Sequence, residues 1–149
     1  MTKSDRLKPV SRVAESRERK AAVEMADFRR FLDAQRARLE ELQCYRSDYV
    51  RQFEHAGRQG LDAGRMLDYR RILAQLSEAI AWQERRLAVL RQDYEQIRRR
   101  WTDSRTRTAA LEKVMERYRD EERRQTDRRE QGELDERAQR PVRPLEPEA

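Results

Sequence analysis

Few side chains in this sequence have the type and spacing that catalysis or metal binding requires. His55 is the only histidine, and it has no neighbouring cysteine or second histidine with which to share a metal ion. Cys44 is also single, as is usual for proteins of a reducing compartment, and we interpret it as a structural bystander. We therefore predict no catalytic residue, no metal site and no cofactor.

The glycine-containing stretch GRQGLDAGR, residues 57–65, is the other place to look for chemistry. A phosphate-binding loop needs a lysine followed by serine or threonine, and it follows a strand; neither condition is met here. Carboxylates are abundant, but catalysis needs them in a concave pocket that excludes water. The elements described next offer no such pocket, and we predict that the protein is not an enzyme.

The composition indicates long helices instead of a compact globule. Charged residues make up 43% of the 149 residues and hydrophobic ones 36%, with only 4 glycines and 4 prolines. A globular core needs more apolar residues and more turns than this. Disorder is the competing interpretation at such a charge content, and the hydrophobic pattern decides between the two.

A heptad pattern runs through the second half of the chain. Stepping by seven from Met66 and from Tyr69 reaches Met115 and Tyr118, and every position except Gln83, Ser104 and Thr108 is apolar or aromatic. Alternating spacings of three and four place one apolar seam along a helix, which is typical of a coiled coil. A disordered chain has no reason to keep this phase.

A weaker seam precedes the glycines, along rows from Met25 to Phe53 and from Leu7 to Ala56. Two seams joined by a short glycine-rich connection favour an antiparallel hairpin, with Asp62 capping the second helix. We predict an all-α fold: one antiparallel coiled-coil domain over residues 1–140, with helix one at about 6–56, a turn at 57–63 and helix two at about 64–140. The part of helix two after residue 118 should overhang, and 141–149 should form a flexible, proline-containing tail.

The pairing register follows from setting Ala56 opposite Met66. Phe28 then faces Tyr94, and Tyr49 faces Leu73. Charged residues flanking the seam oppose one another in this register. The complementary pairs are Glu24 with Arg100, Glu15 with Arg105, Arg36 with Glu84, and Lys8 with Glu112; the like-charge pairs are Arg17 with Arg107, Arg38 with Arg86, and Arg29 with Arg91.

The net positive charge of the chain makes nucleic acid a candidate partner. The formal net charge is +6, and the second helix carries arginine runs at 70–71, 85–86 and 98–100, close to Trp101. Such a stripe is the electrostatic footprint of phosphate binding. Arg100 and Arg105 are expected to face glutamates, however, and Trp101 occupies the seam. We expect no nucleic-acid partner, and a basic coiled coil that binds nucleic acid or serves as a general structural adaptor remains the alternative.

Two further absences indicate the location. No run of about 18 apolar residues is available to span a membrane, and the N-terminal MTKSDRLKPV contains no apolar secretion segment. We expect the chain to stay inside the cell.

Apolar residues that the seam does not require identify a candidate partner surface. Tyr45 lies on the flanking edge beside Leu42 and Tyr49, while Ile72 and Ala79 lie on the matching edge beside Leu76. These edges face each other in an antiparallel pair. A thickened core would explain such residues, but tyrosines with polar tips at a solvent-open edge favour a binding surface.

The segments YRSDYVRQF and RMLDYRRILAQLSEAIAWQ, separated by a glycine-containing turn, resemble the centre of the FliJ family of flagellar export proteins. The resemblance continues through Trp101 and ALEKVMERY to GELDERAQR, and so covers nearly the whole chain. It implies an antiparallel coiled coil of the flagellar type III export apparatus, soluble and similar to the stalk subunit of rotary ATPases.

The resemblance also implies partners and site residues. The expected partners are the flagellar export ATPase ring, the membrane export gate and export chaperones, which would place the chain peripherally at the inner face of the cell membrane at the flagellar base. The gate-binding surface would comprise Leu42, Tyr45, Tyr49, Leu76 and Ala79. The sequence departs from the family pattern at Arg38, Ile72 and Gln83; Ile72 keeps the apolar character and is included in the surface. Leu134, Asp135 and Glu136 would contact the ATPase ring.

Overall fold

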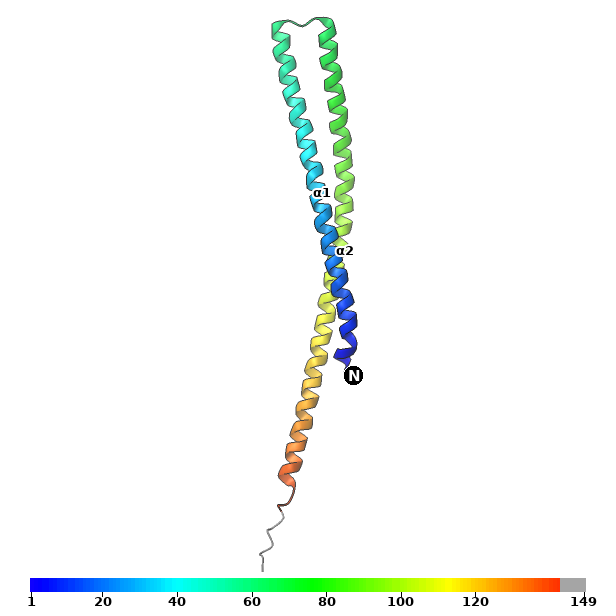
Figure 1. Cartoon of the computed structure of the whole chain (residues 1–149), viewed down its shortest axis with the longest axis vertical. Coiled ribbons are helices and arrows are strands. Elements are labelled where there is room, and N and C mark those ends of the chain that lie inside the picture. The colour runs from blue at the N-terminus through cyan, green and yellow to red at the C-terminus, as the bar shows by residue number, and fades with distance from the viewer. Residues whose placement is uncertain (143–149) are drawn as a thin grey trace, which may run out of the picture. The chain divides into compact units, whose positions relative to one another are not determined.

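The computed structural model describes residues 1–142, which form two long α-helices and no strand (Figure 1). Helix α1 spans Lys3–Gln59 and helix α2 spans Ala63–Gln139. The helices run antiparallel, so the predicted coiled-coil hairpin is confirmed. The tail predicted at 141–149 lies, from residue 143 onward, outside the described residues.

The turn between the helices is shorter than predicted. Helix α1 continues through Gly57 and ends at Gln59, and Gly60 follows with φ of 94°. This left-handed conformation is strained for residues with a Cβ atom and natural for glycine at a helix C-terminus. Asp62 caps α2 as predicted: its Oδ1 accepts a hydrogen bond from the backbone N–H of Arg65 at 2.7 Å.

Helix α1 also begins earlier than the predicted residue 6. Thr2 and Asp5 form a reciprocal cap, in which the Asp5 N–H donates to Thr2 Oγ1 and the Thr2 N–H donates to Asp5 Oδ2. The spacing is that of a capping box, with aspartate in the acidic position. The sequence contained this signal in TKSD, before Pro9, which lies inside the helix.

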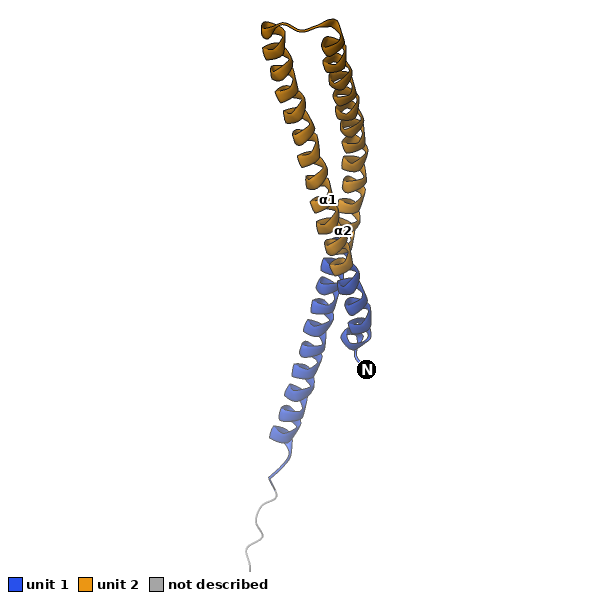
Figure 2. Ribbon diagram, turned by 45° about the horizontal axis from the view of Figure 1, so that its top comes forward, with its two compact units in different colours: residues 1–17, 105–149 blue, residues 18–104 orange. Residues whose placement is uncertain are grey.

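The chain divides into two compact units, coloured separately in Figure 2. Unit 2 comprises Glu18–Ser104, and unit 1 comprises Met1–Arg17 with the chain from Arg105 onward. Each unit pairs a segment of α1 with a segment of α2. That residues 1–140 act as one domain stays a prediction.

Unit 2 holds most of the apolar core. Leu32, Leu87 and Ile97 are buried at the seam, and Leu87 is only 2% exposed. The register agrees with the prediction at two places: the rings of Phe28 and Tyr94 stack with centroids 6.3 Å apart, and Arg100 lies 3.5 Å from Glu24. Arg36 instead pairs with Asp33 on its own helix, at 3.9 Å, so its predicted pairing with Glu84 is wrong.

Unit 1 is paired through smaller and more polar residues. Ser4, Ser11 and Thr108 are buried there together with Met115. Ser4 donates from its backbone N–H to Glu122 Oε1 at 3.2 Å and from its hydroxyl to Glu122 Oε2 at 2.7 Å. The overhang predicted to start after residue 118 therefore begins later, because α1 starts three residues earlier than expected and its first turn reaches Glu122.

Candidate functional site: a tyrosine patch and a charged helix end

Unit 2 carries all six residues of the predicted gate-binding surface. We call this surface the tyrosine patch; it consists of Leu42, Tyr45 and Tyr49 on α1 and Ile72, Leu76 and Ala79 on α2. The spacings of three and four along each helix place these residues on one side of it. Tyr45 is 60% exposed, whereas the other five are partly buried.

The two tyrosines of the patch differ in role. The Tyr49 ring turns toward the seam, where its centroid lies 5.2 Å from that of Tyr69; Phe53 contacts the same ring at 5.2 Å. Burial, with smaller contributions from Tyr69, Tyr45 and Asp68, raises the pKa of Tyr49 above its ordinary value. Because its ring packs against Tyr69 at the seam, Tyr49 is the fixed part of the patch, while Tyr45 presents its ring to solvent.

Gln83 is not part of this surface. Its side chain is only 1% exposed, and its Nε2 donates to the backbone oxygen of Gln35 at 3.0 Å and to Gln35 Oε1 at 2.9 Å. Gln83 is therefore a polar residue of the seam. Of the other two positions at which the sequence departs from the expected family pattern, Arg38 is exposed and Ile72 is partly buried.

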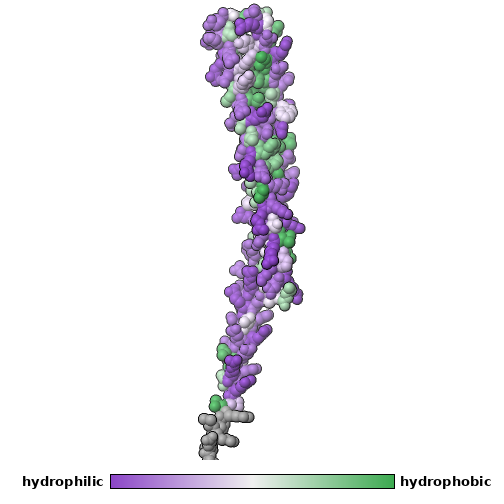
Figure 3. Space-filling model, in the orientation of Figure 1, coloured by the Kyte–Doolittle hydropathy of each residue, from purple (hydrophilic) through white to green (hydrophobic). Residues whose placement is uncertain are grey.

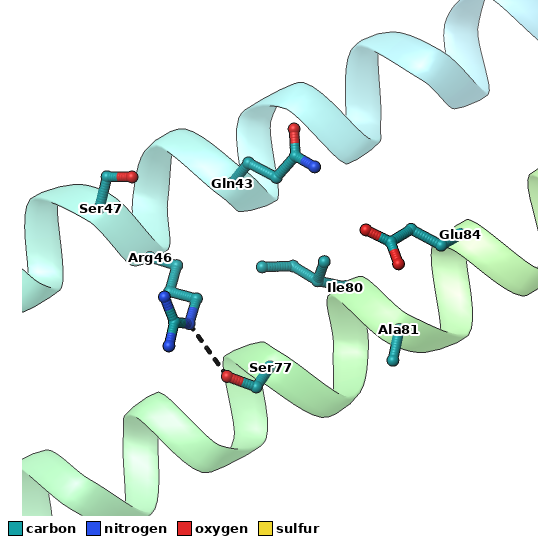
Figure 4. Close-up of a pocket in the computed structure, with 7 residues that line it drawn as sticks. All are labelled: Gln43, Arg46, Ser47, Ser77, Ile80, Ala81 and Glu84. Atoms are coloured by element: carbon teal, nitrogen blue, oxygen red, sulfur yellow. Dashed lines mark hydrogen bonds between the residues drawn. The ribbon is translucent and has the colours of Figure 1, made fainter.

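On the edge of the unit 2 seam opposite the tyrosine patch, the charged residue Arg46 occupies a seam position. Arg46 belongs to the apolar row of α1, and its guanidinium Nε donates to Ser77 Oγ at 2.9 Å, as Figure 4 shows. Gln43, Ile80 and Glu84 line the same shallow pocket of about 340 Å³. This edge is polar, in contrast to the tyrosine patch.

The residues predicted to contact the ATPase ring lie near the end of α2, in unit 1. Leu134, Asp135 and Glu136 are all exposed, and Leu134 is 62% exposed. Leu134 lines a small surface pocket with Glu130, Glu133 and Arg137, all from α2 itself. The structure thus presents an apolar side chain among charges on a solvent-facing helix, and it assigns these residues and the tyrosine patch to different units.

The surface is mostly polar. The face visible in Figure 3 is largely hydrophilic, and its hydrophobic residues gather mainly over unit 2. Within residues 1–142 no three potential metal ligands cluster. Neither helix, over that range, is apolar and long enough to pass through a membrane. Cys44 is exposed and unpaired, and His55 is exposed.

The fold and the site together define an antiparallel coiled-coil hairpin that exposes an aromatic side chain beside apolar residues in unit 2 and mainly charged side chains at the end of α2. The chain belongs to the flagellar FliJ protein family, whose model matches residues 2–143. It is accordingly a protein related to flagellar export. Comparison with curated proteins gave no match, and comparison with solved structures gave none.

Proposed function

We propose that this protein is a coiled-coil stalk that couples the flagellar export ATPase ring to the membrane export gate. It also assists the recycling of export chaperones, and it reaches the inner face of the membrane at the flagellar base through these partners. Membership of the FliJ family supports a role in export. The exposure of Tyr45, beside apolar residues of both helices, is the observation that carries the gate assignment.

The tyrosine patch suits an apolar protein partner. Tyr45 leaves most of its ring in solvent in this chain, and burial of an aromatic ring releases a large apolar area while its hydroxyl keeps a hydrogen bond. Tyr49 is held against Tyr69 and provides a rigid neighbour. Pre-ordered aromatic residues of this kind commonly dominate binding free energy at protein interfaces.

The end of α2 suits a different partner surface. Residues 123–140 are exposed and alternate acidic with basic side chains around Leu134. A helix with this pattern gains little from packing on its own chain. We assign Leu134, Asp135 and Glu136 to the ATPase ring, with affinity that falls as salt rises because exposed charges are screened.

Two variants test the division of roles. Tyr45→Ala should weaken binding to the purified gate domain by about tenfold or more, since interface tyrosines often contribute ~2 kcal/mol on truncation. Leu67→Ala, which removes an exposed apolar side chain outside the patch, is the matched control. Titration calorimetry should show unchanged affinity for the ATPase in Tyr45→Ala and in Leu67→Ala.

The second variant is a truncation after Arg128. A cut after Tyr118 would also remove Glu122, the partner of Ser4, and so would disturb the pairing in unit 1. The truncation after Arg128 should impair ATPase binding and leave gate binding intact; Leu134→Ala, Asp135→Asn and Glu136→Gln combined should act in the same direction. Equal losses for both partners in either variant, with helicity retained, would contradict the proposal.

A further inference from the structure

A second groove lies between the helices of unit 2, and the proposed function does not use it. We call it the arginine groove because Arg29 and Arg36 of α1 and Arg91 and Arg98 of α2 line it. Its volume is about 570 Å³. Arg36 lies 3.9 Å from Asp33, and Arg98 lies 3.7 Å from Glu95; each of these pairs lies within one helix.

Arg29 and Arg91 are different, because the side chain of neither forms an ion pair or hydrogen bond with any other described residue. They line the same groove from opposite helices, in agreement with the register that sets them opposite each other. Like charges opposed across a coiled-coil seam disfavour that pairing. The chain therefore keeps an unfavourable pair of charges that an anionic ligand would neutralise.

The walls of the arginine groove are not uniformly charged. Leu32 and Tyr94 also line it, and the Tyr94 ring is held by its stacking on Phe28. A guanidinium binds a carboxylate through two parallel hydrogen bonds, so Arg29 and Arg91 each provide a directional site for an acidic side chain. Beside them, Tyr94 offers an apolar contact.

The acidic residues of the groove favour a protein ligand over nucleic acid. Asp33 and Glu95 lie among the arginines, and they would repel a continuous phosphate backbone. A protein segment can place its carboxylates at Arg29 and Arg91 and other side chains near Asp33 and Glu95. From Met25 to Arg36 the groove follows about 17 Å of helix, which matches a helical segment of about 12 residues.

We propose that the arginine groove binds an acidic amphipathic segment of a partner protein, with carboxylates on Arg29 and Arg91 and an apolar side chain against Tyr94. This site is independent of the tyrosine patch and of the C-terminal part of α2. The proposal stands on the charges and walls of the groove, and it holds whether or not the gate and ring assignments are correct.

The test uses the full chain and a labelled synthetic helical peptide of about 12 residues, which carries glutamates on one side and leucines on the adjoining side. A second peptide has glutamine in place of each glutamate. The variant Arg29→Gln with Arg91→Gln should lose about tenfold or more of its affinity for the acidic peptide, measured by fluorescence anisotropy. The control, Arg71→Gln with Arg99→Gln, changes net charge equally at exposed positions outside the groove and should change affinity less than about twofold.

Two further measurements separate this site from general charge attraction. Arg29→Lys with Arg91→Lys keeps the charge but removes the bidentate geometry, and it should lose part of the affinity. The glutamine double variant without peptide should melt at a slightly higher temperature, because the opposed charges are gone. Equal losses in the groove and control variants, equal binding of the two peptides, or tighter binding of duplex DNA that depends on Arg29 and Arg91 would each overturn the proposal.

Discussion

Unit 2 and unit 1 use the same antiparallel helix pairing but stabilise it with different chemistry. In unit 2 the helices meet through buried leucines and through aromatic contacts such as Phe28 with Tyr94. In unit 1 the buried residues include two serines and a threonine, and Ser4 bonds to a carboxylate. Apolar burial does not depend on the ionisation of a side chain, whereas hydrogen bonds to a charged group do.

The contrast extends to the surfaces that each unit offers. Unit 2 leaves Tyr45 exposed beside a well-packed seam, which suits a persistent apolar interface. Unit 1 ends in a stretch of α2 whose exposed side chains are mostly charged. The two units therefore differ in chemistry on one heptad scaffold: unit 2 exposes an aromatic side chain beside a packed seam, whereas the end of α2 exposes mainly charged side chains.

Leu87→Ala should have the largest expected effect, because it removes a buried side chain from the apolar seam of unit 2. Leu87 is almost fully buried, and truncation of a buried leucine costs about 2–5 kcal/mol of unfolding free energy. Thermal unfolding followed by circular dichroism measures the change. Val89→Ala, at an exposed position two residues away, should stay within about 0.5 kcal/mol of the unsubstituted protein; similar losses in the two variants would refute the seam described for unit 2.

Gln83 allows the register of unit 2 to be tested separately from its stability. Gln83→Ala removes both hydrogen bonds to Gln35 and should cost about 1–3 kcal/mol, since Gln35 loses its buried partner. Gln35→Leu combined with Gln83→Leu should restore or raise the melting temperature but weaken the register, because a buried polar pair specifies alignment.

Disulfide trapping in a Cys44→Ser background reports this register. Glu24→Cys with Arg100→Cys joins positions that are paired in the structure, whereas Glu24→Cys with Asp93→Cys joins positions one heptad apart. The first pair should crosslink far more efficiently in the unsubstituted seam, and the double leucine variant should narrow the difference. An unchanged ratio would show that Gln35 and Gln83 do not set the alignment.

The smallest expected effect is a pH dependence of stability that unit 1 should show and unit 2 should not. The hydroxyl of Thr2, with Lys8, lowers the pKa of Asp5 from 3.8 to about 2, and the hydroxyl of Ser4 lowers the pKa of Glu122 below 4.5. Both pKa values are lower in the folded chain than in the unfolded chain, so the ionised carboxylates stabilise the fold. This stabilisation is complete at a pH above the unfolded-state pKa values, and it is lost as pH falls through the lower pKa values of the folded chain.

Nuclear magnetic resonance can follow this loss between about pH 5 and pH 2. The amide signal of Ser4, whose N–H donates to Glu122, should move toward its unfolded position as pH falls, while the signals of residues around Leu87 should not. Glu122→Gln should abolish most of the pH response of the Ser4 amide. A simultaneous change in both units would mean that the N-terminal turn is not stabilised separately by these carboxylates.

The heptad rows from Met66 and Tyr69, the glycine-rich connection and the cap at Asp62 were sufficient to predict the antiparallel hairpin and its register. These signals can be seen in the sequence because they depend on interactions within one helix or along one regularly repeating seam. The resemblance to the FliJ family rested instead on particular segments such as YRSDYVRQF and RMLDYRRILAQLSEAIAWQ, and the family model confirms it over residues 2–143.

Only the tertiary structure shows which partners the individual polar and charged side chains have. The sequence did not show which partner Gln83 takes, that Arg36 prefers Asp33 on its own helix, or that Ser4 reaches Glu122 across 118 residues. Arg29 and Arg91 could be set opposite each other from the register, but only the folded chain places them in one groove with Tyr94 and without an ion-pair partner among residues 1–142. The reason is that polar and charged side chains choose among several acceptors of similar energy, and three-dimensional distance selects between them.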